Sequence, residues 1–447
     1  MQQPPATCPA VFLTAPASGQ GKTTITAGIA RLLKRQQCKV KVFKCGPDYL
    51  DPQILEQASG QAVEPLDLWM AGDQYCQQRF FEAAQQNDLI IVEGAMGMFD
   101  GTPSSADLAA RFNIPMVLVM DVKGMAQTAA AVASGLASFR QDITVTGLIA
   151  NHCSTARHRE LIEDNLPECL PLWANLPRAE NIALPERHLG LVQANEIHQE
   201  LEQRFEAAAD ALQLAGLLPL IQSLPATEFY AVDSYSGGCD NIDQALAGKT
   251  IAIAKDNAFS FIYQANVDLL RKMGAKVCYF SPLSDHELPA CDAIWLPGGY
   301  PELHARSLSE NTQMLQQIRE SVQSGLPVLA ECGGFLYCLE TLTDLNDQQY
   351  PMAAALTGHG AMRGKRGCQG MQTAPLPEGN VRAHAHHRSL AHGTPEAISY
   401  GKRQRHSAPG EAVFRQNRLT ASYLHLFFPS NPLAIAKLFG YQEVPSI

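Results

Sequence analysis

The sequence predicts two α/β domains joined by a linker. Three observations support this: apolar strands alternate with helical patterns in the first half, periodicity is lost over 223–248, and the alternation then restarts. The middle stretch collects Ser, Gly, Asp and Pro, as linkers do. A chain of 447 residues, 46% hydrophobic and 17% charged, has a globular composition and is too long for one core. We therefore expect domains at 1–222 and 249–447.

The first half has the pattern of βα units. A buried strand over 11–15 precedes a helix that places Ile25, Ile29 and Leu32 on one face. Further strands are predicted at 40–43, 89–92, 116–120 and 145–150, and a helical pattern at 195–218. Such continuous apolar strands are typical of a parallel sheet covered on both faces.

The second half repeats this alternation. Its predicted strands are 250–254, 277–280, 293–296 and 328–330, and a helix is expected between 261 and 273. The second domain is therefore also expected to contain a parallel sheet.

A phosphate-binding loop follows the first strand. The sequence APASGQGKTT at 15–24 joins strand to helix, and backbone N–H groups of such a loop point at phosphate oxygens. Lys22 would reach the β/γ phosphates and Thr23 would bind Mg²⁺. Pro16 stands where the usual motif has glycine, and an ordinary glycine-rich turn is the alternative. The expected ATP-binding residues are Ser18, Gly19, Gly21, Lys22, Thr23 and Thr24.

Acidic residues follow two other strands of the first domain. Glu93 ends the strand at 89–92, at the sheet edge where α/β folds bind ligands. Asp48 and Asp51 lie three apart in a constrained loop after the strand at 40–43. These three are candidate Mg²⁺ ligands, although turn formation is an equal alternative for the two aspartates.

Three further polar residues of this domain are weaker candidates. Asn151 follows the strand at 145–150, where its amide can bind an adenine edge; a surface turn is equally plausible. Tyr49 and Asp100, in the loops beside the metal candidates, are candidates for contact with the substrate.

A cysteine nucleophile is predicted in the second domain. The sequence VLAECGGFL places Cys332 between a strand and a helix, where a helix N-terminus lowers a thiol pKa. Gly333 and Gly299, from two glycine-rich strand ends, are the expected oxyanion donors. His425, on a strand near the C-terminus, is the candidate base. A buried structural cysteine and a core histidine are the alternatives.

A second group of histidines lies nearby in the sequence. His384, His386 and His387 invite a metal-site interpretation, but no second ligand group is evident and Arg388 opposes a cation. An anion-binding loop is the preferred hypothesis.

Charge and cysteine pattern exclude several classes of function. The net charge is −10 and no basic block occurs, which argues against nucleic-acid binding. No apolar run reaches the length of a membrane span, and residues 1–7 lack a signal-peptide pattern. The twelve cysteines form no C-x-x-C pair, which favours the reducing cytoplasm. A homodimer remains open.

Six segments in this order resemble the cobyrinate/hydrogenobyrinate a,c-diamide synthase family almost end to end. They are APASGQGKTT at 15–24, FKCGPDYLDP at 43–52, VEGAMGMFDG at 92–101, LPGGYPE at 296–302, AECGG at 330–334 and ASYLH at 421–425. The resemblance implies a dethiobiotin-synthetase-like ATP domain and a class I glutaminase-like domain. It also implies ATP, Mg²⁺, glutamine and a tetrapyrrole acid as ligands.

The resemblance also implies residue roles. Cys332 would be the nucleophile and His425 its activator; Phe427 stands where many class I glutaminases have Glu, so a dyad is implied. His384, His387 and Ser389 match a family segment whose role here is open.

Alternative functions are a related tetrapyrrole amidation, as in cobyric acid synthase or nickel-sirohydrochlorin a,c-diamide synthase, and a regulatory ATPase. The ATPases with this loop carry a lysine at the position of Ala17. A binding protein with an inactive glutaminase domain is a further rival.

Overall fold

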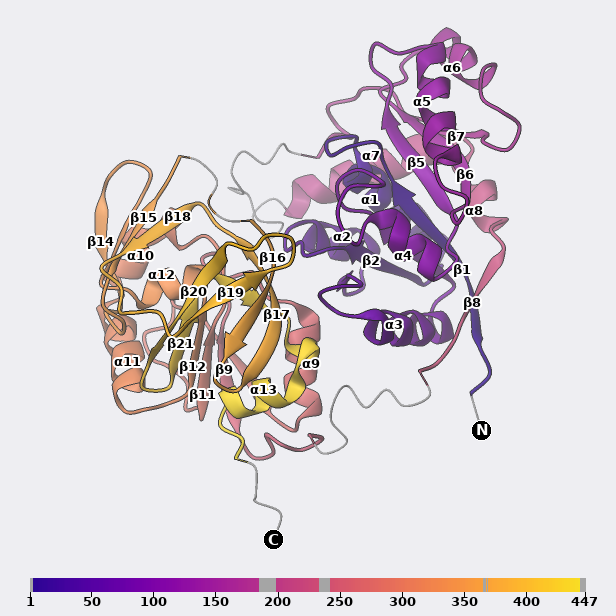
Figure 1. The fold of residues 1–447 in the computed structure, drawn as a ribbon. Coiled ribbons are helices and arrows are strands. Elements are labelled where there is room, and N and C mark those ends of the chain that lie inside the picture. Colours follow the sequence, from indigo (N-terminus) through magenta and orange to yellow (C-terminus); the bar gives the residue numbers. More distant parts are fainter. Residues whose placement is uncertain (1–2, 185–197, 233–241, 365–366, 368, 443–447) are drawn as a thin grey trace. The chain divides into compact units, whose positions relative to one another are not determined.

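The computed structural model describes residues 3–184, 198–232, 242–364, 367 and 369–442 (Figure 1). The chain divides into two compact units, Met1–Tyr235 and Ser236–Ile447. Each unit is built on its own largest sheet with helices packed against it, which confirms the predicted α/β class.

The first unit contains a parallel sheet in the order β3-β2-β4-β1-β5-β6-β7. Its strands are β1 Ala6–Thr14, β2 Val40–Cys45, β3 Glu64–Leu66, β4 Leu89–Glu93, β5 Met116–Asp121, β6 Val145–Asn151 and β7 Leu172–Asn175. The five predicted strands are confirmed. The short strands β3 and β7 were not predicted.

Helices cover both faces of this sheet. They are α1 Lys22–Arg35, α2 Asp51–Ser59, α3 Asp73–Gln86, α4 Ser105–Arg111, α5 Gln127–Ser138, α6 Ala156–Glu163, α7 His198–Leu214 and α8 Leu217–Gln222. Val11 and Leu13 of β1 pack in one core with α1, α2 and α7. On the other face, Phe80 of α3 packs edge-on against Phe43 of β2. The carboxyl ends of β1, β2 and β4 therefore meet at one edge of the sheet.

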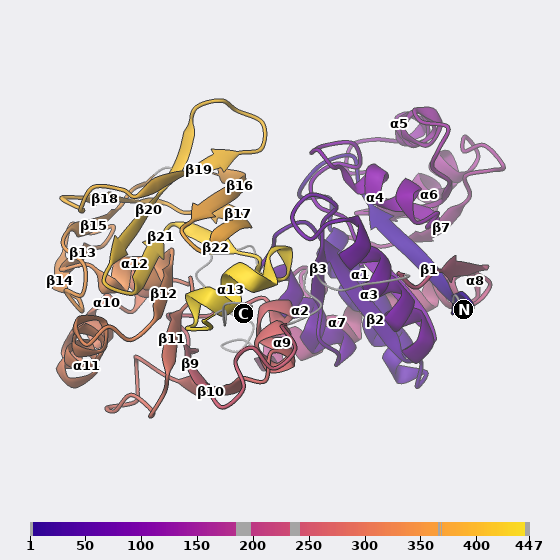
Figure 2. The ribbon, with the colours of Figure 1, turned by 60° about the horizontal axis from the view of Figure 1, so that its bottom comes forward.

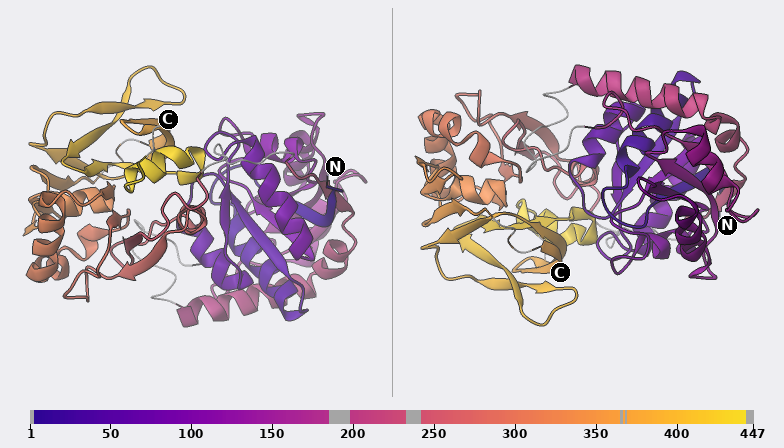
Figure 3. Two further views of the ribbon diagram at one scale, coloured as in Figure 1. Left: turned by 90° about the horizontal axis from the view of Figure 1, so that it is seen from below. Right: turned by 90° about the horizontal axis from the view of Figure 1, so that it is seen from above.

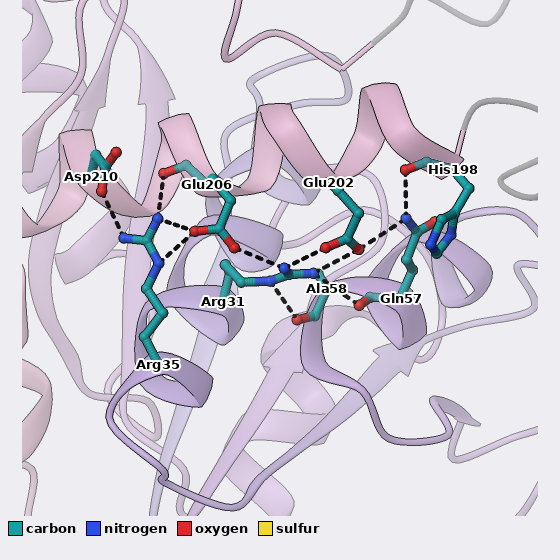
Figure 4. A network of polar contacts seen from close by, with 8 residues as sticks. All are labelled: Arg31, Arg35, Gln57, Ala58, His198, Glu202, Glu206 and Asp210. Atoms are coloured by element: carbon teal, nitrogen blue, oxygen red, sulfur yellow. Dashed lines mark hydrogen bonds and ion pairs between the residues drawn. The ribbon is translucent and has the colours of Figure 1, made fainter.

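Helix α7 packs along α1, at the outside of the first unit (Figure 3). At Gly28 of α1, a Cβ would come within 2.9 Å of the Ala208 Cβ of α7, so only glycine permits this approach. Arg31 and Arg35 of α1 pair with three acidic side chains of α7 (Figure 4): Glu202, Glu206 and Asp210. The predicted helical pattern is confirmed from residue 198; residues 195–197 lie outside the described residues.

The predicted linker over 223–248 is wrong at both of its ends. Residues 226–229 form β8 (Ala226–Phe229), which pairs antiparallel with the start of β1. Ile242 and Leu246 are buried in a core of the second unit. Thr227 and Phe229 are buried and alternate with exposed residues, which gives β8 an inner face. The polar sequence around this strand nevertheless resembles that of a loop. The central residues 233–241 lie outside the described residues.

The second unit contains a ten-stranded sheet in the order β10-β9-β11-β12-β21-β20-β19-β16-β17-β22. Its parallel part is β9 Thr250–Ala254, β10 Lys276–Phe280, β11 Ala293–Leu296, β12 Val328–Glu331 and β21 Leu419–Ser422. The remaining strands are antiparallel: β16 Gln369–Leu376, β17 Gly379–His386, β19 Ser399–Arg403, β20 Pro409–Gln416 and β22 Leu424–Leu426. The four predicted strands are confirmed, whereas the antiparallel half was not predicted beyond the strand that bears His425.

A smaller sheet and seven helical segments complete the described part of this unit. The small sheet has the order β14-β13-β15-β18, with β13 Thr341–Thr343, β14 Gln349–Pro351, β15 His359–Met362 and β18 Ser389–His392. The helical segments are α9 Gln264–Lys272, η1 Pro301–Leu303, α10 Ala305–Glu310, α11 Thr312–Gln323, α12 Gly333–Cys338, η2 Phe428–Ser430 and α13 Pro432–Leu438. Helix α13 packs against β17 (Figure 2), and α9 confirms the helix expected between 261 and 273.

Among the described helices, none has the length and apolar character needed to cross a membrane.

Candidate active sites

The loop after β1 has the backbone that a phosphate-binding loop requires. Gly19 and Gly21 have φ values of 78° and 91°, in the left-handed region that favours glycine, and Gly21 leads directly into α1. The Lys22 Nζ donates to the backbone oxygens of Ala17 and Met96, at 3.3 and 2.7 Å. Burial and, after it, the positive charge of Lys44 together lower the pKa of Lys22 to about 8. The lysine is therefore held inside the loop, next to the expected phosphates.

Glu93 lies fully buried at the end of β4, beside the loop. Its Oε1 accepts from the Thr23 hydroxyl at 3.0 Å and from the Lys44 Nζ at 2.6 Å. Its Oε2 is buried without a hydrogen-bond partner among the described residues. An unpaired carboxylate oxygen beside a threonine hydroxyl is the donor set that Mg²⁺ prefers, so these residues fit the predicted metal site.

Lys44 is a site residue that sequence reasoning missed. Its Nζ lies between Glu93 and Asp51, 2.6 and 3.0 Å from their oxygens, and the side chain is buried. Burial opposes its charge, but Glu93, Asp51 and Asp48 outweigh burial and raise its pKa. The available signal was a lysine near the carboxyl end of a buried strand, directly before the Asp48–Asp51 loop. The structure thus adds a second cation near the expected phosphates.

The two aspartates of this loop have different surroundings. Asp48 Oδ1 accepts from the backbone N–H groups of Leu50 and Asp51, which is the turn geometry weighed as an alternative. Burial raises the pKa of Asp48 to about 6, and the charge of Asp51 raises it further. Asp51 contacts Lys44 directly, and Lys44 also binds Glu93, so these three charged side chains form one group.

The weaker candidates of the first unit also lie around the loop. Asn151 donates its Nδ2 to the Gln20 oxygen at 3.1 Å and accepts from the His152 N–H at 3.1 Å. A Cβ on Gly21 would come within 2.3 Å of the same Nδ2, so Asn151 packs tightly on the loop. Asp100 accepts from the Gly97 N–H. Tyr49 is partly buried and lies two residues before Asp51, the first residue of α2.

Cys332 occupies the sharp strand-to-helix turn that the sequence predicted. It follows β12, precedes α12 and has φ 46° and ψ −98°, a conformation that L-residues rarely adopt. Its N–H donates to the Ser422 oxygen of β21 at 2.8 Å. Strain of this kind collects at functional sites and is tolerated because the surroundings fix it.

Two glycine turns lie against each other beside this cysteine. A Cβ on Gly333 would come within 2.9 Å of the Gly299 backbone nitrogen. A Cβ on Gly299 would meet the Ala258 oxygen at 2.0 Å, so neither position accepts a side chain. The two predicted oxyanion donors are therefore neighbours.

His425 lies on β22, against the same turn. A Cβ on Gly298 would come within 2.3 Å of its Cε1, and its ring centre lies 5.9 Å from that of Phe261. Burial, then the charges of neighbouring histidines, hold its pKa well below the usual value. His384 of β17 pairs with it across the sheet. Gly333, the residue after Cys332, and His425 thus both border the Gly298–Gly299 turn.

The expected lowering of the Cys332 thiol pKa is wrong. Burial raises it, and the negative charge of Glu302 raises it further, while the Gly333 N–H lowers it. Cys332 is only 5% exposed, and α12 has just six residues. In this arrangement the loss of hydration outweighs the helix terminus, and thiol and imidazole are both neutral.

The group at 384–387 has two different surroundings. His387 stacks on Tyr423 at 3.8 Å, and its Nε2 lies 3.1 Å from Glu411, so it faces an acid and not an anion site. Burial lowers the pKa of His384 to about 3, which leaves it neutral. Both findings count against the anion-binding hypothesis. The described residues include no group of three or more His, Cys, Asp or Glu side chains placed to hold a metal ion.

Comparisons with known proteins assign a domain family to each unit. Residues 11–192 match the CobQ/CobB/MinD/ParA nucleotide binding domain, and residues 250–433 match the CobB/CobQ-like glutamine amidotransferase domain. A hydrogenobyrinate a,c-diamide synthase of Stutzerimonas stutzeri is 47% identical, over 96% of this chain and 98% of the relative. A hydrogenobyrinate a,c-diamide synthase of Pseudomonas aeruginosa is 45% identical, over 97% of this chain and 98% of the relative.

A cobyrinate a,c-diamide synthase of Herminiimonas arsenicoxydans is 41% identical, over 98% of both chains. These matches span both units and both sites, at identities far above what a shared fold alone produces. The chain therefore belongs to the cobyrinate/hydrogenobyrinate a,c-diamide synthase family.

Proposed function

We propose that this chain uses ATP and glutamine to convert the a and c carboxylates of hydrogenobyrinate or cobyrinate into amides, in cobalamin biosynthesis and in the cytoplasm. The observation that carries the proposal is the pairing of two sites in one chain. Lys22, Thr23 and Glu93 meet at a phosphate loop, while His425 and Gly333, the residue after Cys332, border one glycine turn. The ten cysteines described as free thiols are consistent with a reducing compartment.

In the second unit, Cys332 attacks the side-chain amide carbon of glutamine. His425, neutral because of burial, takes the thiol proton and later gives it to the departing ammonia. The N–H groups of Gly333 and Gly299 stabilise the oxyanion. Water then hydrolyses the thioester, which yields glutamate and restores the thiol.

In the first unit, a substrate carboxylate oxygen attacks the γ-phosphorus of ATP, the P–O bond to the β-phosphate breaks, and ADP leaves as the acyl phosphate forms. Activation is needed because a carboxylate is a poor electrophile. Lys22 and Lys44 stabilise the charge on the transferring phosphoryl group, and the loop N–H groups of 18–24 hold the nucleotide. Ammonia attacks the acyl phosphate, the C–O bond to phosphate breaks, and the amide and phosphate leave.

Mg²⁺, held by Thr23 and Glu93 with Asp51 or Asp48, would neutralise phosphate charge when bound. Asn151, which packs on the loop, would border the nucleotide, and Tyr49 and Asp100 would contact the substrate. Two rounds of reaction would consume two ATP and two glutamine molecules.

The test compares Cys332→Ala and Lys22→Met with the unmodified chain, using ATP, Mg²⁺, each macrocycle and either glutamine or ammonium. Cys332→Ala should lose amidation with glutamine and keep it with ammonium, whereas Lys22→Met should lose both. If Cys332→Ala fails with ammonium too, or still uses glutamine, the division of labour is wrong.

Mass spectrometry of the product also decides among the rival substrates. Products of a cobyric acid synthase or of a nickel-sirohydrochlorin a,c-diamide synthase would carry amides on another ring or at other carboxylates. Hydrogenobyrinate is the first substrate to try, because the two relatives above 44% identity carry that name. A regulatory ATPase would hydrolyse ATP without forming any amide.

A further inference from the structure

The strand that carries His425 has a backbone ladder on one side only. β22 pairs with β17, whereas β12, which ends next to Cys332, pairs with β11 and β21. Tyr423 separates β21 from β22. Within the described strands, no ladder pairing therefore joins the cysteine strand to the histidine strand.

A buried carboxyl group occupies this break. Glu331, the last residue of β12, is 2% exposed. Its Oε1 accepts from the Leu426 N–H at 2.8 Å, and its Oε2 accepts from the Trp295 Nε1–H at 2.9 Å. The Glu331 side chain thus connects β11, β12 and β22. Glu331 is the residue before Cys332, and Leu426, which it binds, is the residue after His425.

We propose that Glu331 is a positioning residue of the glutaminase site: its carboxyl group fixes the backbone that carries His425 relative to Cys332. The inference rests on the proposed function, which makes these two residues nucleophile and base. Glu331 acts through the main chain of Leu426. It does not take the place of the glutamate that many class I glutaminases have at the position of Phe427.

The surroundings of Leu426 show how tightly this backbone is held. Asn266 of α9, 1% exposed, donates its Nδ2 to the Leu426 oxygen at 2.9 Å and accepts from the Phe428 N–H at 2.8 Å. Buried side chains therefore hold both the N–H and the C=O of Leu426. Because the His425 ring lies directly against Gly298, a shift of the strand would move the imidazole along the oxyanion turn.

A carboxyl group suits this position and a carboxamide does not. Both oxygens accept from N–H donors, whereas glutamine has one accepting oxygen and would turn its NH₂ toward the second donor. The pKa of Glu331 is about 8, because burial raises it more than the hydrogen bonds from Leu426 and Trp295 lower it. At neutral pH the group is mainly the neutral acid, whose two oxygens both still accept hydrogen bonds. Glu331→Gln keeps the volume and removes one acceptor, which makes it a sharp test.

The experiment measures steady-state amidation with glutamine and with ammonium for Glu331→Gln, Trp295→Phe and the double variant. Glu331→Gln should lower kcat with glutamine by about 10–100-fold, the cost of an ångström-scale misplacement. KM for glutamine and the rate with ammonium should stay within about twofold.

Trp295→Phe is the matched control. It removes the hydrogen bond from the indole N–H to Glu331 and leaves the hydrogen bond from the Leu426 N–H to Glu331 intact. Its rate with glutamine should stay within about threefold of the unmodified chain. The double variant should recover most of the loss, since the amide oxygen can accept from Leu426 with no indole N–H opposite the NH₂. If Glu331→Gln does not fold, Glu331→Met takes its place with the same expected loss.

A rate with glutamine that is unchanged in folded Glu331→Gln, an equal loss with ammonium, or no recovery in the double variant would each overturn the role of Glu331. Cys332→Ala is assayed in parallel. If that variant still uses glutamine, the proposed site fails; if it does not and Glu331→Gln remains fully active, only the positioning role fails.

Discussion

Cys332 shows how burial sets the reactivity of a single residue. Its thiol pKa is raised by burial and that of His425 is lowered, so a thiolate–imidazolium pair is disfavoured in the free chain. An acid with a raised pKa ionises only at higher pH. We therefore expect alkylation of Cys332 by iodoacetamide to be slow at neutral pH and to keep rising beyond about pH 9, above the ordinary thiol pKa of about 8.5.

The measurement is the rate of labelling of the Cys332 peptide by mass spectrometry as a function of pH. Cys332→Ser gives the background from other cysteines. A rate that levels off below pH 7 would show a thiolate paired with an imidazolium and would contradict the neutral resting state.

Lys44 is the second residue whose loss should have a defined cost. Lys44→Met leaves Glu93 buried without its ammonium partner, which should lower the free energy of unfolding by about 3–5 kcal/mol. Amidation should be lost with glutamine and with ammonium alike. Urea unfolding and product formation measure the two effects.

Lys41 of the same strand provides the control. It forms a similarly buried ion pair with Glu64 at 2.6 Å, away from the phosphate loop. Lys41→Met should destabilise the protein comparably and keep amidation in the fraction that remains folded. Equal loss of activity in both variants would mean that Lys44 matters only for stability.

At the scale of elements, the predictable parts were those that local pattern specifies. Continuous apolar runs predicted β1, β4 and β5, because buried parallel strands need no polar face. In β17 the buried positions are Val381, Ala383 and Ala385, and alanine gives too weak a signal of alternation. β8 was missed because its pairing with β1 joins segments over two hundred residues apart.

The candidate sites divide in the same way. Motif spacing singled out Lys22, Glu93, Cys332 and His425 as candidates. The roles of Lys44 and Glu331 depend on contacts between strands distant in sequence, which no local pattern contains. The thiol pKa could not be predicted either, since burial is a property of the packed fold.

The contact between α1 and α7 yields a prediction about an element. Arg31 is 8% exposed in its side chain and binds Glu202, Glu206 and two backbone oxygens (Figure 4). Arg31→Met should lower the free energy of unfolding by about 2–4 kcal/mol, since it leaves those acceptors unpaired. The more exposed Arg35, changed to Met, should cost at most about 1 kcal/mol.

The pH dependence of this difference follows from Glu202. Its hydrogen bond with Arg31 lowers its pKa to about 2 from a usual 4.5. A lowered carboxyl pKa contributes stability that is present above the usual value and lost as pH falls through the folded one. The gap between the unmodified chain and Arg31→Met should therefore narrow from pH 5 toward pH 2. A gap that widens on acidification would contradict this ion pair.

At the scale of the whole molecule, each unit has its own interior. One described core cluster draws only on residues 11–224, and the two others only on residues 242–439. The residues proposed for each site likewise lie in one unit: Lys22, Thr23 and Glu93 in the first, Cys332, Gly299 and His425 in the second. Because each unit contains its own core and the residues of one proposed site, we expect each half to fold and act without the other.

We therefore expect a chain cut after Tyr235 to yield two halves that each unfold in one cooperative transition. The first half should amidate the macrocycle with ammonium and ATP, because no residue assigned to that step lies beyond 235. It should not respond to glutamine, because the nucleophile is absent. Carrying Lys22→Met in the same half controls for contaminating activity. A first half that folds but forms no amide with ammonium would show that the second unit supplies part of the synthetase site, since loss of ammonia delivery alone cannot explain that failure.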